Sequence, residues 1–404
     1  MAPHSWRTPA VIMTCGGLII TLGMGVRHTF GLFLLPMSAD LGWGREVFSF
    51  AIAVQNLVWG ASQPLFGMVA DRFGSARVLV CGAVLFIAGL TVMAFATTPA
   101  MLTLGAGVII GLSLSGTTFS VVFGVVGRAT TPEKRSMALG LVGAAGSFGQ
   151  FVMVPFGQTL ISAIGWFHAL LVLAATALLM LPLSFALVED RRTGAQESNQ
   201  TIAQSLRQAF AHRGFWLLTL GYFVCGFQVV FIAVHLPSYL LDKGLNASVG
   251  MTALALIGLG NIVGTYACGA LGGRYSKKYL LAGLYFMRSV VIALLLAFPV
   301  TPLSVYLFAG AMGVLWLGTV PLTNGLVAQI FGVKYLAMLS GFVFFSHQIG
   351  SFLGVWLGGY LFDRTGSYDV VWVICIALGV VAALLNLPID ERSAQQPNLK
   401  AAAA

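Results

Sequence analysis

Two arginines lie inside apolar stretches of the chain that are long enough to cross a lipid bilayer. Arg27 and Arg288 are flanked on both sides by apolar residues, and none of the twelve Asp and Glu residues lies deep in such a stretch. A guanidinium near the middle of a membrane costs about 2.5–3.5 kcal/mol on insertion scales, so an intramembrane arginine is a candidate functional group. Because the chain has no acid at that depth, the pattern indicates a site for an anion from outside the chain.

Arg27 is the stronger candidate of the two arginines. It precedes Pro36 by nine residues, which is about 13 Å along a helix and therefore near the middle of the first stretch. Arginine suits a carboxylate because its planar fork binds both oxygens and stays charged. The alternative is an arginine that bonds to backbone carbonyls or extends to the membrane surface. For Arg288 we favour that structural role, tied to carbonyls or to a neighbouring helix.

Three histidines are further candidates for substrate or proton binding: His28, His235 and His347. Histidine titrates near physiological pH, and without a buried carboxylate these side chains are the ones placed to carry a coupled proton. The alternative is that each is a packed, hydrogen-bonded core residue. His28 points about 100° away from Arg27 around the helix, so we expect only one of the two to face a central cavity squarely.

Smaller polar groups complete the predicted substrate site. Residues of this kind within apolar stretches more often bond to a neighbouring helix than to a substrate, but together they would line a cavity that has donors and no anionic wall. The candidates are Gln228, Asn261, Thr265, Trp316, Asn324 and Gln348. The sequence shows no paired carboxylates, no Cys/His metal spacing and no phosphate-binding loop, so we expect no enzyme, no cofactor and no metal. The five cysteines are expected to be free, packed thiols.

The composition indicates that membrane-spanning helices position these side chains. Hydrophobic residues make up 58% of the chain and charged residues only 8%, whereas a soluble domain is about one-quarter charged. A helical span needs about 20 apolar residues, and hydropathy predicts twelve spans in an all-α membrane protein. They cover residues 10–36, 46–70, 76–96, 99–126, 135–163, 166–188, 214–240, 247–272, 278–298, 302–331, 335–362 and 369–388.

The basic residues predict how the chain is oriented. With the N-terminus in the cytoplasm, most Lys and Arg residues fall on the cytoplasmic side, and only Arg45, Lys243 and Arg364 fall outside. Both termini are therefore expected in the cytoplasm, in a multi-pass protein of the cell inner (plasma) membrane. The net charge of +9 then reflects topology and contact with the lipid bilayer, and we expect no nucleic-acid partner.

The two halves of the chain resemble each other. The pattern Gly-x-x-x-Asp-Arg-x-Gly at residues 67–74 recurs in degenerate form at residues 269–276, and Arg27 is matched 201 residues later by Gln228. The repeat predicts two pseudo-symmetric six-helix bundles. The expected divisions are an N-terminal bundle at 1–188, a cytoplasmic linker at 189–213, a C-terminal bundle at 214–390 and a cytoplasmic tail at 391–404.

The loop motif, its second copy and the paired halves resemble the major facilitator superfamily over essentially the whole chain. The resemblance implies alternating access by two bundles that rock around a midplane site. It also implies a cytoplasmic gate, whose candidate residues here are Asp71, Arg72, Arg77 and Arg274. The alternative for these four is helix capping and topology alone. Because Gly273 stands where the second acid would be, the gate charges should be concentrated in the N-terminal half.

Within that superfamily, residues 27–43 and Asn261-x-x-Gly264-Thr265 are similar to the monocarboxylate and oxalate/formate porters. This chain departs from them at Thr265, where those porters carry a substrate arginine, and in the eleventh span, which has His347 in the region of their lysine. The resemblance suggests that the anion-binding group has moved to Arg27 in the first half.

We therefore expect a monomeric secondary transporter of a small organic anion, a monocarboxylate or a dicarboxylate, with a proton as the candidate coupled ion. The alternatives are a proton-coupled exporter of drugs or metabolites and a non-transporting membrane sensor. A missing intramembrane acid disfavours cationic drugs, and a longest loop of about 25 residues disfavours a sensor with its own soluble domain.

Overall fold

The computed structural model describes residues 6–130, 132–188, 202–332 and 336–393, and this part of the chain contains helices and no strand. The helices of the first half are α1 (Pro9–His28), α2 (Phe30–Leu41), α3 (Arg45–Phe73), α4 (Ser75–Ala94), α5 (Pro99–Leu102), the π-helix η1 (Thr103–Ile109), α6 (Ile110–Thr117), α7 (Phe119–Ala129), α8 (Pro132–Ala177) and α9 (Met180–Phe185). Those that follow are α10 (Ile202–Ala211), α11 (Arg213–Asp242), α12 (Ala247–Gly272), α13 (Lys277–Ala297), α14 (Pro302–Leu315), α15 (Thr319–Phe331), α16 (Leu336–Thr365) and α17 (Asp369–Asn386).

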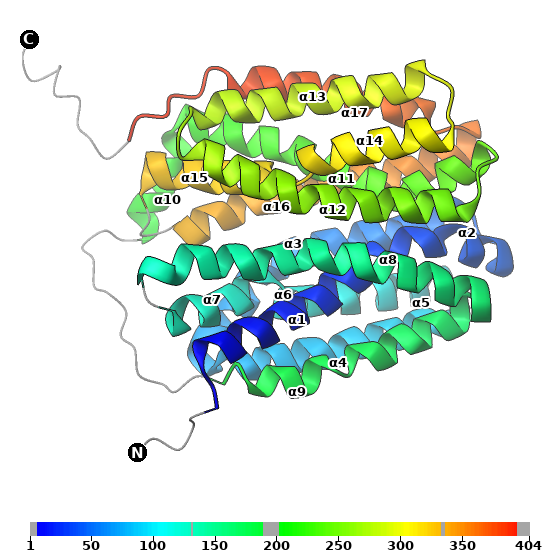
Figure 1. The fold of residues 1–404 in the computed structure, drawn as a ribbon, viewed down its shortest axis with the longest axis horizontal. Coiled ribbons are helices and arrows are strands. Elements are labelled where there is room, and N and C mark those ends of the chain that lie inside the picture. The colour runs from blue at the N-terminus through cyan, green and yellow to red at the C-terminus, as the bar shows by residue number, and fades with distance from the viewer. Residues whose placement is uncertain (1–5, 131, 189–201, 333–335, 394–404) are drawn as a thin grey trace, which may run out of the picture.

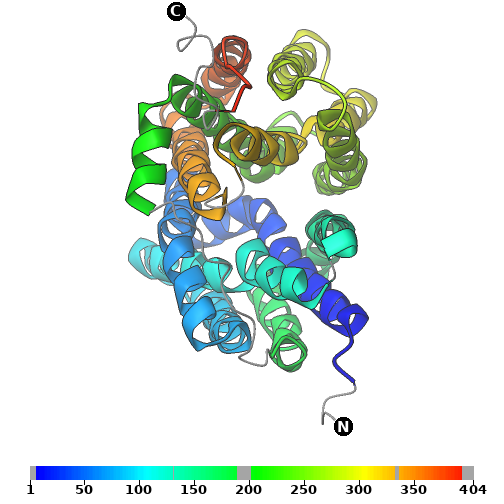
Figure 2. The ribbon, with the colours of Figure 1, turned by 90° about the vertical axis from the view of Figure 1, so that its left-hand side faces the viewer.

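The helices lie roughly parallel to one long axis and gather into two groups (Figure 1). Seen from one end, helices from the first half of the chain occupy the lower group and helices from the second half the upper one (Figure 2). Buried apolar side chains form two clusters that follow this grouping. One is drawn almost entirely from residues 19–187 and the other mainly from residues 209–389.

Ten helical stretches in the described residues are long and apolar enough to cross a membrane. The difference from the twelve expected has two local causes. One stretch, Ala138–Phe185, runs through Gly165, whose φ of 76° and ψ of 166° break α8 into two helices. The 29-residue α3 is not among the ten, because Gln55, Asn56 and Gln63 lower its hydropathy. The protein is therefore a multi-pass, all-helical membrane protein.

The two helix groups touch where glycines let backbones approach. Gly31 of α2 lies against the carbonyl oxygen of Ala233 on α11, and Gly258 of α12 lies against the side chain of Gln150 on α8. A Cβ at either position would meet the neighbouring helix at or below the shortest normal contact distance. Contacts between α3 and α16 run from Gly44 beside Asp363 to Gly60 beside Gln348. Gln150 and Gln348 therefore lie at the contact between the groups.

Candidate binding site between the two helix groups

Arg27 projects from α1 toward α3. Its Nη2 donates a hydrogen bond of 2.6 Å to Oδ1 of Asn56, and its guanidinium carbon lies 5.1 Å from the ring centroid of Trp59. Asn56 is itself fixed, because its amide nitrogen donates to the carbonyl of Ile52 at 2.8 Å. Arg27 is half-buried and has no carboxylate partner among the described residues. Within the described part of the chain its guanidinium contacts a neutral amide and an aromatic face, and neither carries a counter-charge.

Aromatic rings connect the Arg27 site to the second helix group. The ring of Trp59 packs edge-on against Phe344 of α16 at a centroid distance of 5.4 Å. Phe344 stacks on His347 at 5.7 Å with an interplanar angle of 10°, and Tyr222 of α11 covers His347 at 4.9 Å. His347, a candidate from the sequence, is therefore joined to Arg27 through rings that cross the contact between the groups.

Three hydrogen-bond donors in this region are buried and have no acceptor within the described residues. They are Nε of Arg27, Nε1 of Trp59 and Nε2 of Gln348. Gln348 is fully buried beside Gly60, the residue after Trp59, and its Oε1 lies 3.1 Å from Nδ1 of His347. A buried donor without a partner costs about 1–3 kcal/mol. All three atoms are donors, so they match the chemistry of an acceptor such as a carboxylate.

A second polar connection joins the two groups at α8 and α12. Nδ2 of Asn261 donates to Oγ of Ser147 at 2.8 Å. Its Oδ1 accepts hydrogen bonds from the backbone N–H of Leu317 and the hydroxyl of Thr265, both at 3.0 Å. Asn261 and Thr265 are thus brought together, but their polar atoms are already used within the protein. They connect helices in this conformation.

Other predicted site residues lie away from Arg27. His28 is buried, and its Nδ1 lies 2.6 Å from the carbonyl oxygen of Met24 in its own helix. Gln228 turns toward α17, where its Nε2 donates to the carbonyl of Cys375 at 2.8 Å. Gln228, which the internal repeat matches to Arg27, therefore bonds inside the second group rather than across the contact between the groups.

His235, Trp316 and Asn324 also lie away from Arg27. His235 is enclosed within the second group, with Nε2 2.8 Å from the carbonyl of Val355 and Nδ1 3.2 Å from the hydroxyl of Tyr368. Trp316 lies fully buried at the break between α14 and α15, and Asn324 is half-buried on α15. None of these side chains has a described contact with Arg27, Trp59 or Gln348.

Arg288 occupies a structural position. It is fully buried on α13, and its Nε and Nη2 donate to the carbonyl of Leu315 at 2.9 and 2.7 Å. Nη2 also donates to the carbonyl of Trp316, and Nη1 to Sγ of Cys225 at 3.3 Å. These carbonyls belong to the last turn of α14, where a helix leaves its acceptors without partners. Arg288 thus caps the break between α14 and α15.

We expect Arg288→Ala to lower the stability of the folded protein strongly. The variant leaves two buried carbonyls without donors, at about 1–3 kcal/mol each, and removes a large buried side chain. The measurement is thermal unfolding of purified protein in detergent, with Arg274→Ala as the control because Arg274 is exposed. Unchanged unfolding of Arg288→Ala would contradict the capping role.

The predicted gate residues lie at the end of the molecule where α3 ends, α4 begins and α12 ends. The side chain of Asp71 lies outside the described residues. Arg72, Arg77 and Arg274 are exposed, and Arg72 lies over the ring of its neighbour Phe73 at 5.4 Å. A gate built from these charges therefore stays a prediction.

The opposite end carries a charged group that the sequence analysis counted only for topology. Arg45, the first residue of α3, forms a bidentate pair with Asp242 of α11, with both N–O distances 2.6 Å. Its Nη1 also donates to the hydroxyl of Tyr368 at 2.9 Å. The carboxylate of Asp363 on α16 accepts hydrogen bonds from the backbone N–H groups of Arg45 and Glu46, at 2.9 and 2.8 Å. We call Arg45, Asp242, Asp363 and Tyr368 the Arg45 cluster, and it ties the two helix groups together.

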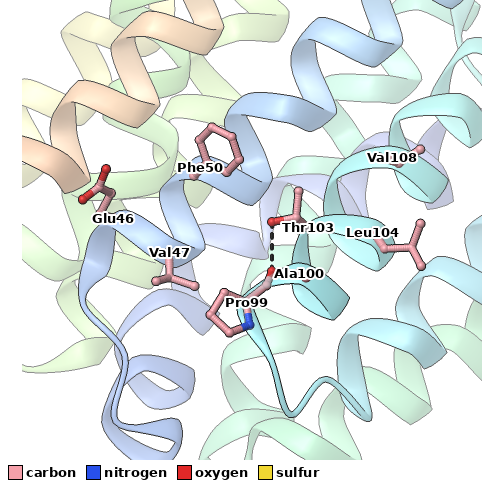
Figure 3. A pocket seen from close by; sticks show the side chains of 8 residues that line it. All are labelled: Glu46, Val47, Phe50, Pro99, Ala100, Thr103, Leu104 and Val108. Atoms are coloured by element: carbon pink, nitrogen blue, oxygen red, sulfur yellow. Dashed lines mark hydrogen bonds between the residues drawn. The ribbon is translucent and has the colours of Figure 1, made fainter.

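A surface pocket near this end does not coincide with the Arg27 site (Figure 3). Its lining residues are Glu46, Val47, Phe50, Pro99, Ala100, Thr103, Leu104 and Val108. Glu46, its one charged lining residue, precedes Asn56 by ten residues, which is about 15 Å along α3. An acidic group in an apolar pocket does not suit an anion, so the pocket is separate from the candidate site.

The sequence matches the family model described as Major Facilitator Superfamily over residues 13–331 and 259–403. The chain is 25% identical over 403 residues to "Uncharacterized MFS-type transporter YcxA" of Bacillus subtilis (strain 168), covering 94% of this chain and 95% of that protein. It is 27% identical over 390 residues to "Monocarboxylate transporter 13" of Rattus norvegicus, covering 91% and 86%. It is 26% identical over 384 residues to "Monocarboxylate transporter 11" of Homo sapiens, covering 91% and 79%. Because the family model matches most of the chain, the chain belongs to the major facilitator superfamily.

Proposed function

We propose that this protein is a secondary transporter that moves a small organic anion, a monocarboxylate or a dicarboxylate, across the membrane. The observation that carries the proposal is the set of buried donors without acceptors around Arg27, Trp59 and Gln348. They come from α1, α3 and α16, so a bound carboxylate would contact both helix groups. Monocarboxylate transporters among the relatives agree with this substrate class.

The proposed architecture has twelve spans in two pseudo-symmetric bundles, divided as the internal repeat predicts. Splitting the Ala138–Phe185 stretch at Gly165 and adding α3 brings the ten apolar stretches to twelve. We propose that the protein lies in the plasma (inner) membrane with both termini in the cytoplasm. The Arg45 cluster then lies on the outer side, and the conformation is closed there.

Transport in this proposal follows alternating access. A carboxylate bound between Arg27 and Gln348 is shared by the two bundles, so a rocking motion changes which side of the membrane it faces. The rings of Trp59 and Phe344 pack beside it and exclude water from the ion pair, which strengthens the electrostatic attraction.

A ligand screen by thermal shift tests the proposal. A ligand that binds the folded state raises the apparent melting temperature. At a ligand concentration 100 times the dissociation constant, the added stability is about 2.7 kcal/mol. We expect monocarboxylates or dicarboxylates to stabilise the purified protein and sugars and cationic dyes to leave it unchanged. Stabilisation by cationic dyes alone would favour the exporter instead. Binding of carboxylates without uptake into proteoliposomes would favour the sensor.

A further inference from the structure

The short helix α10 is oriented differently from the long helices. The apolar stretches that can cross a membrane run along the long axis of the molecule (Figure 1). In Figure 2, where those helices are seen nearly end-on, α10 (bright green, at the left-hand edge) is seen from the side. The candidate span of α11 begins at Arg213, two residues after α10 ends. Therefore α10 lies at the level of the membrane boundary and roughly parallel to the membrane plane.

Contacts with α11 and α16 hold α10 in this orientation. His212 caps α11, because its Nδ1 accepts a hydrogen bond from the backbone N–H of Gly214 at 3.1 Å. Nε1 of Trp216 donates to the carbonyl of Phe210 at 2.8 Å, in the last turn of α10, where a helix leaves its acceptors without partners. The ring of Phe210 also packs on Phe342 of α16 at a centroid distance of 5.3 Å. These contacts attach α10 to the second helix group.

The two faces of α10 carry different side chains. Ser205 and Ala209, one helical turn apart, are buried against the protein. Ala203, Arg207 and Phe210 lie on the opposite side and are exposed. The outward face of α10 therefore presents an aromatic ring and a positive charge.

Three exposed aromatic residues, Phe210, Trp216 and Phe342, form one patch, which we call the α10 patch. Their exposed fractions are 39%, 47% and 43%, and the ring of Phe210 lies 5.6 and 5.3 Å from the rings of the other two. Nε1 of Trp216 is already bonded within the protein, so the patch offers mainly apolar ring surface. Exposed aromatic rings at the level of a membrane boundary are typical of the interfacial belt of membrane proteins.

Two arginines accompany the α10 patch. Arg207 and Arg213 stand three residues before and three residues after Phe210, and residues 202–216 contain no Asp or Glu. Both arginines are exposed, and neither forms an ion pair within the part of the chain that the structure describes. A basic, aromatic helix that lies in the membrane plane has the chemistry of a segment that binds an anionic lipid surface.

We propose that α10 is a membrane-surface helix that binds anionic phospholipids of the leaflet that faces the cytoplasm in our orientation. The rings of the α10 patch enter the boundary between headgroups and acyl chains, and Arg207 and Arg213 bind the phosphate groups. The patch lies at the level where α11 enters the membrane, which favours lipid over a soluble protein as the occupant. This binding needs no substrate, so it holds or fails independently of the proposed transport.

The first test locates α10 relative to the lipid. A bimane fluorophore is attached to Ala203→Cys in a Cys15→Ser/Cys81→Ser background, since the other three cysteines are buried. The control is the same probe at Arg392→Cys, whose side chain is 90% exposed at the same end of the molecule (Figure 1). In nanodiscs, we expect the Ala203 probe to be quenched by lipids with a spin-labelled headgroup and the Arg392 probe by iodide. Iodide quenching of equal strength at both positions would place α10 in water and overturn the proposal.

The second test measures the preference for anionic lipid. Purified protein in detergent is titrated with phosphatidylglycerol or phosphatidylcholine, and the thermal shift gives the half-saturating lipid concentration. Each arginine near an anionic surface contributes about fivefold to affinity, so Arg207→Gln/Arg213→Gln should require about 30-fold more phosphatidylglycerol than wild type. The control, Arg274→Gln/Arg392→Gln, removes two exposed arginines from other segments and should leave the concentration nearly unchanged. Equal affinity of wild type for the two lipids, or no greater loss in the α10 variant than in the control, would overturn the proposal.

Discussion

Arg27→Ala is expected to abolish saturable carboxylate uptake, with a loss of at least about 100-fold in kcat/KM. A hydrogen bond to a charged group contributes about 1.5–3 kcal/mol, each 1.4 kcal/mol is a factor of about ten, and a carboxylate would occupy two donors of the guanidinium. The variant should still insert and fold, because Arg27 is only half-buried and its one described hydrogen bond is to Asn56. The measurement is initial uptake into proteoliposomes containing equal amounts of protein.

Arg27→Lys is the matched variant for this experiment. It keeps the positive charge but loses the planar fork that binds both oxygens, so we expect uptake between that of wild type and that of Arg27→Ala. Arg128→Ala, in the last turn of α7, controls for the loss of an exposed charge from the N-terminal half. Wild-type uptake by Arg27→Ala would remove Arg27 from the substrate site, and equal loss in the lysine variant would show that geometry matters more than charge.

The sequence predicted those features that depend on one helix at a time. Apolar length located the helices, and the break at Gly165 is one place where two expected spans meet. Arg288 was expected to be tied to carbonyls because its span, the ninth, is peripheral in the family that the chain resembles, and its bonds to Leu315 and Trp316 are of that kind. Locating the helices needs only the local chain, whereas the role of Arg288 also needed the layout of the family.

The sequence could not show which polar side chains face each other across helices. Gln228 was paired with Arg27 by its place in the repeat, but rotation about the helix turns it toward Cys375. Trp59 and Phe344 were not singled out, because aromatic residues in apolar stretches usually pack in the core. Only the position of α16 against α3 brings their rings together.

The contacts at the Arg45 end of the molecule suggest what keeps that end closed. The Arg45 cluster joins α3 to α11 and α16 by charged and hydrogen-bonded groups. Gly31 against Ala233 adds a close backbone contact between the bundles. Opening this end must break all of these contacts, so their free energy sets how often the substrate site faces outward in our orientation.

Arg45→Ala is therefore expected to shift the conformational equilibrium toward the state that is open at the Arg45 end. Asp242 is one-third exposed, so screening reduces the value of the pair, and we assign about 2 kcal/mol to the bidentate bond. That energy corresponds to a roughly 30-fold change in the ratio of open to closed forms. Asp242→Asn should shift the equilibrium in the same direction, since the amide keeps the size of the side chain but not its charge.

Alkylation of a cysteine placed at Val234 measures this change. Val234 is buried beside Gly31 in the closed conformation, so Val234→Cys should react with a membrane-impermeant reagent only when this end opens. We expect the reaction to be about 30-fold faster in the Arg45→Ala background, in proportion to the open population. Arg364→Ala is the matched control, because Arg364 is an exposed arginine near Asp363 on α16 that packs on Tyr360 of its own helix. Equal alkylation rates in wild type, Arg45→Ala and Asp242→Asn would show that the Arg45 cluster does not hold this end closed.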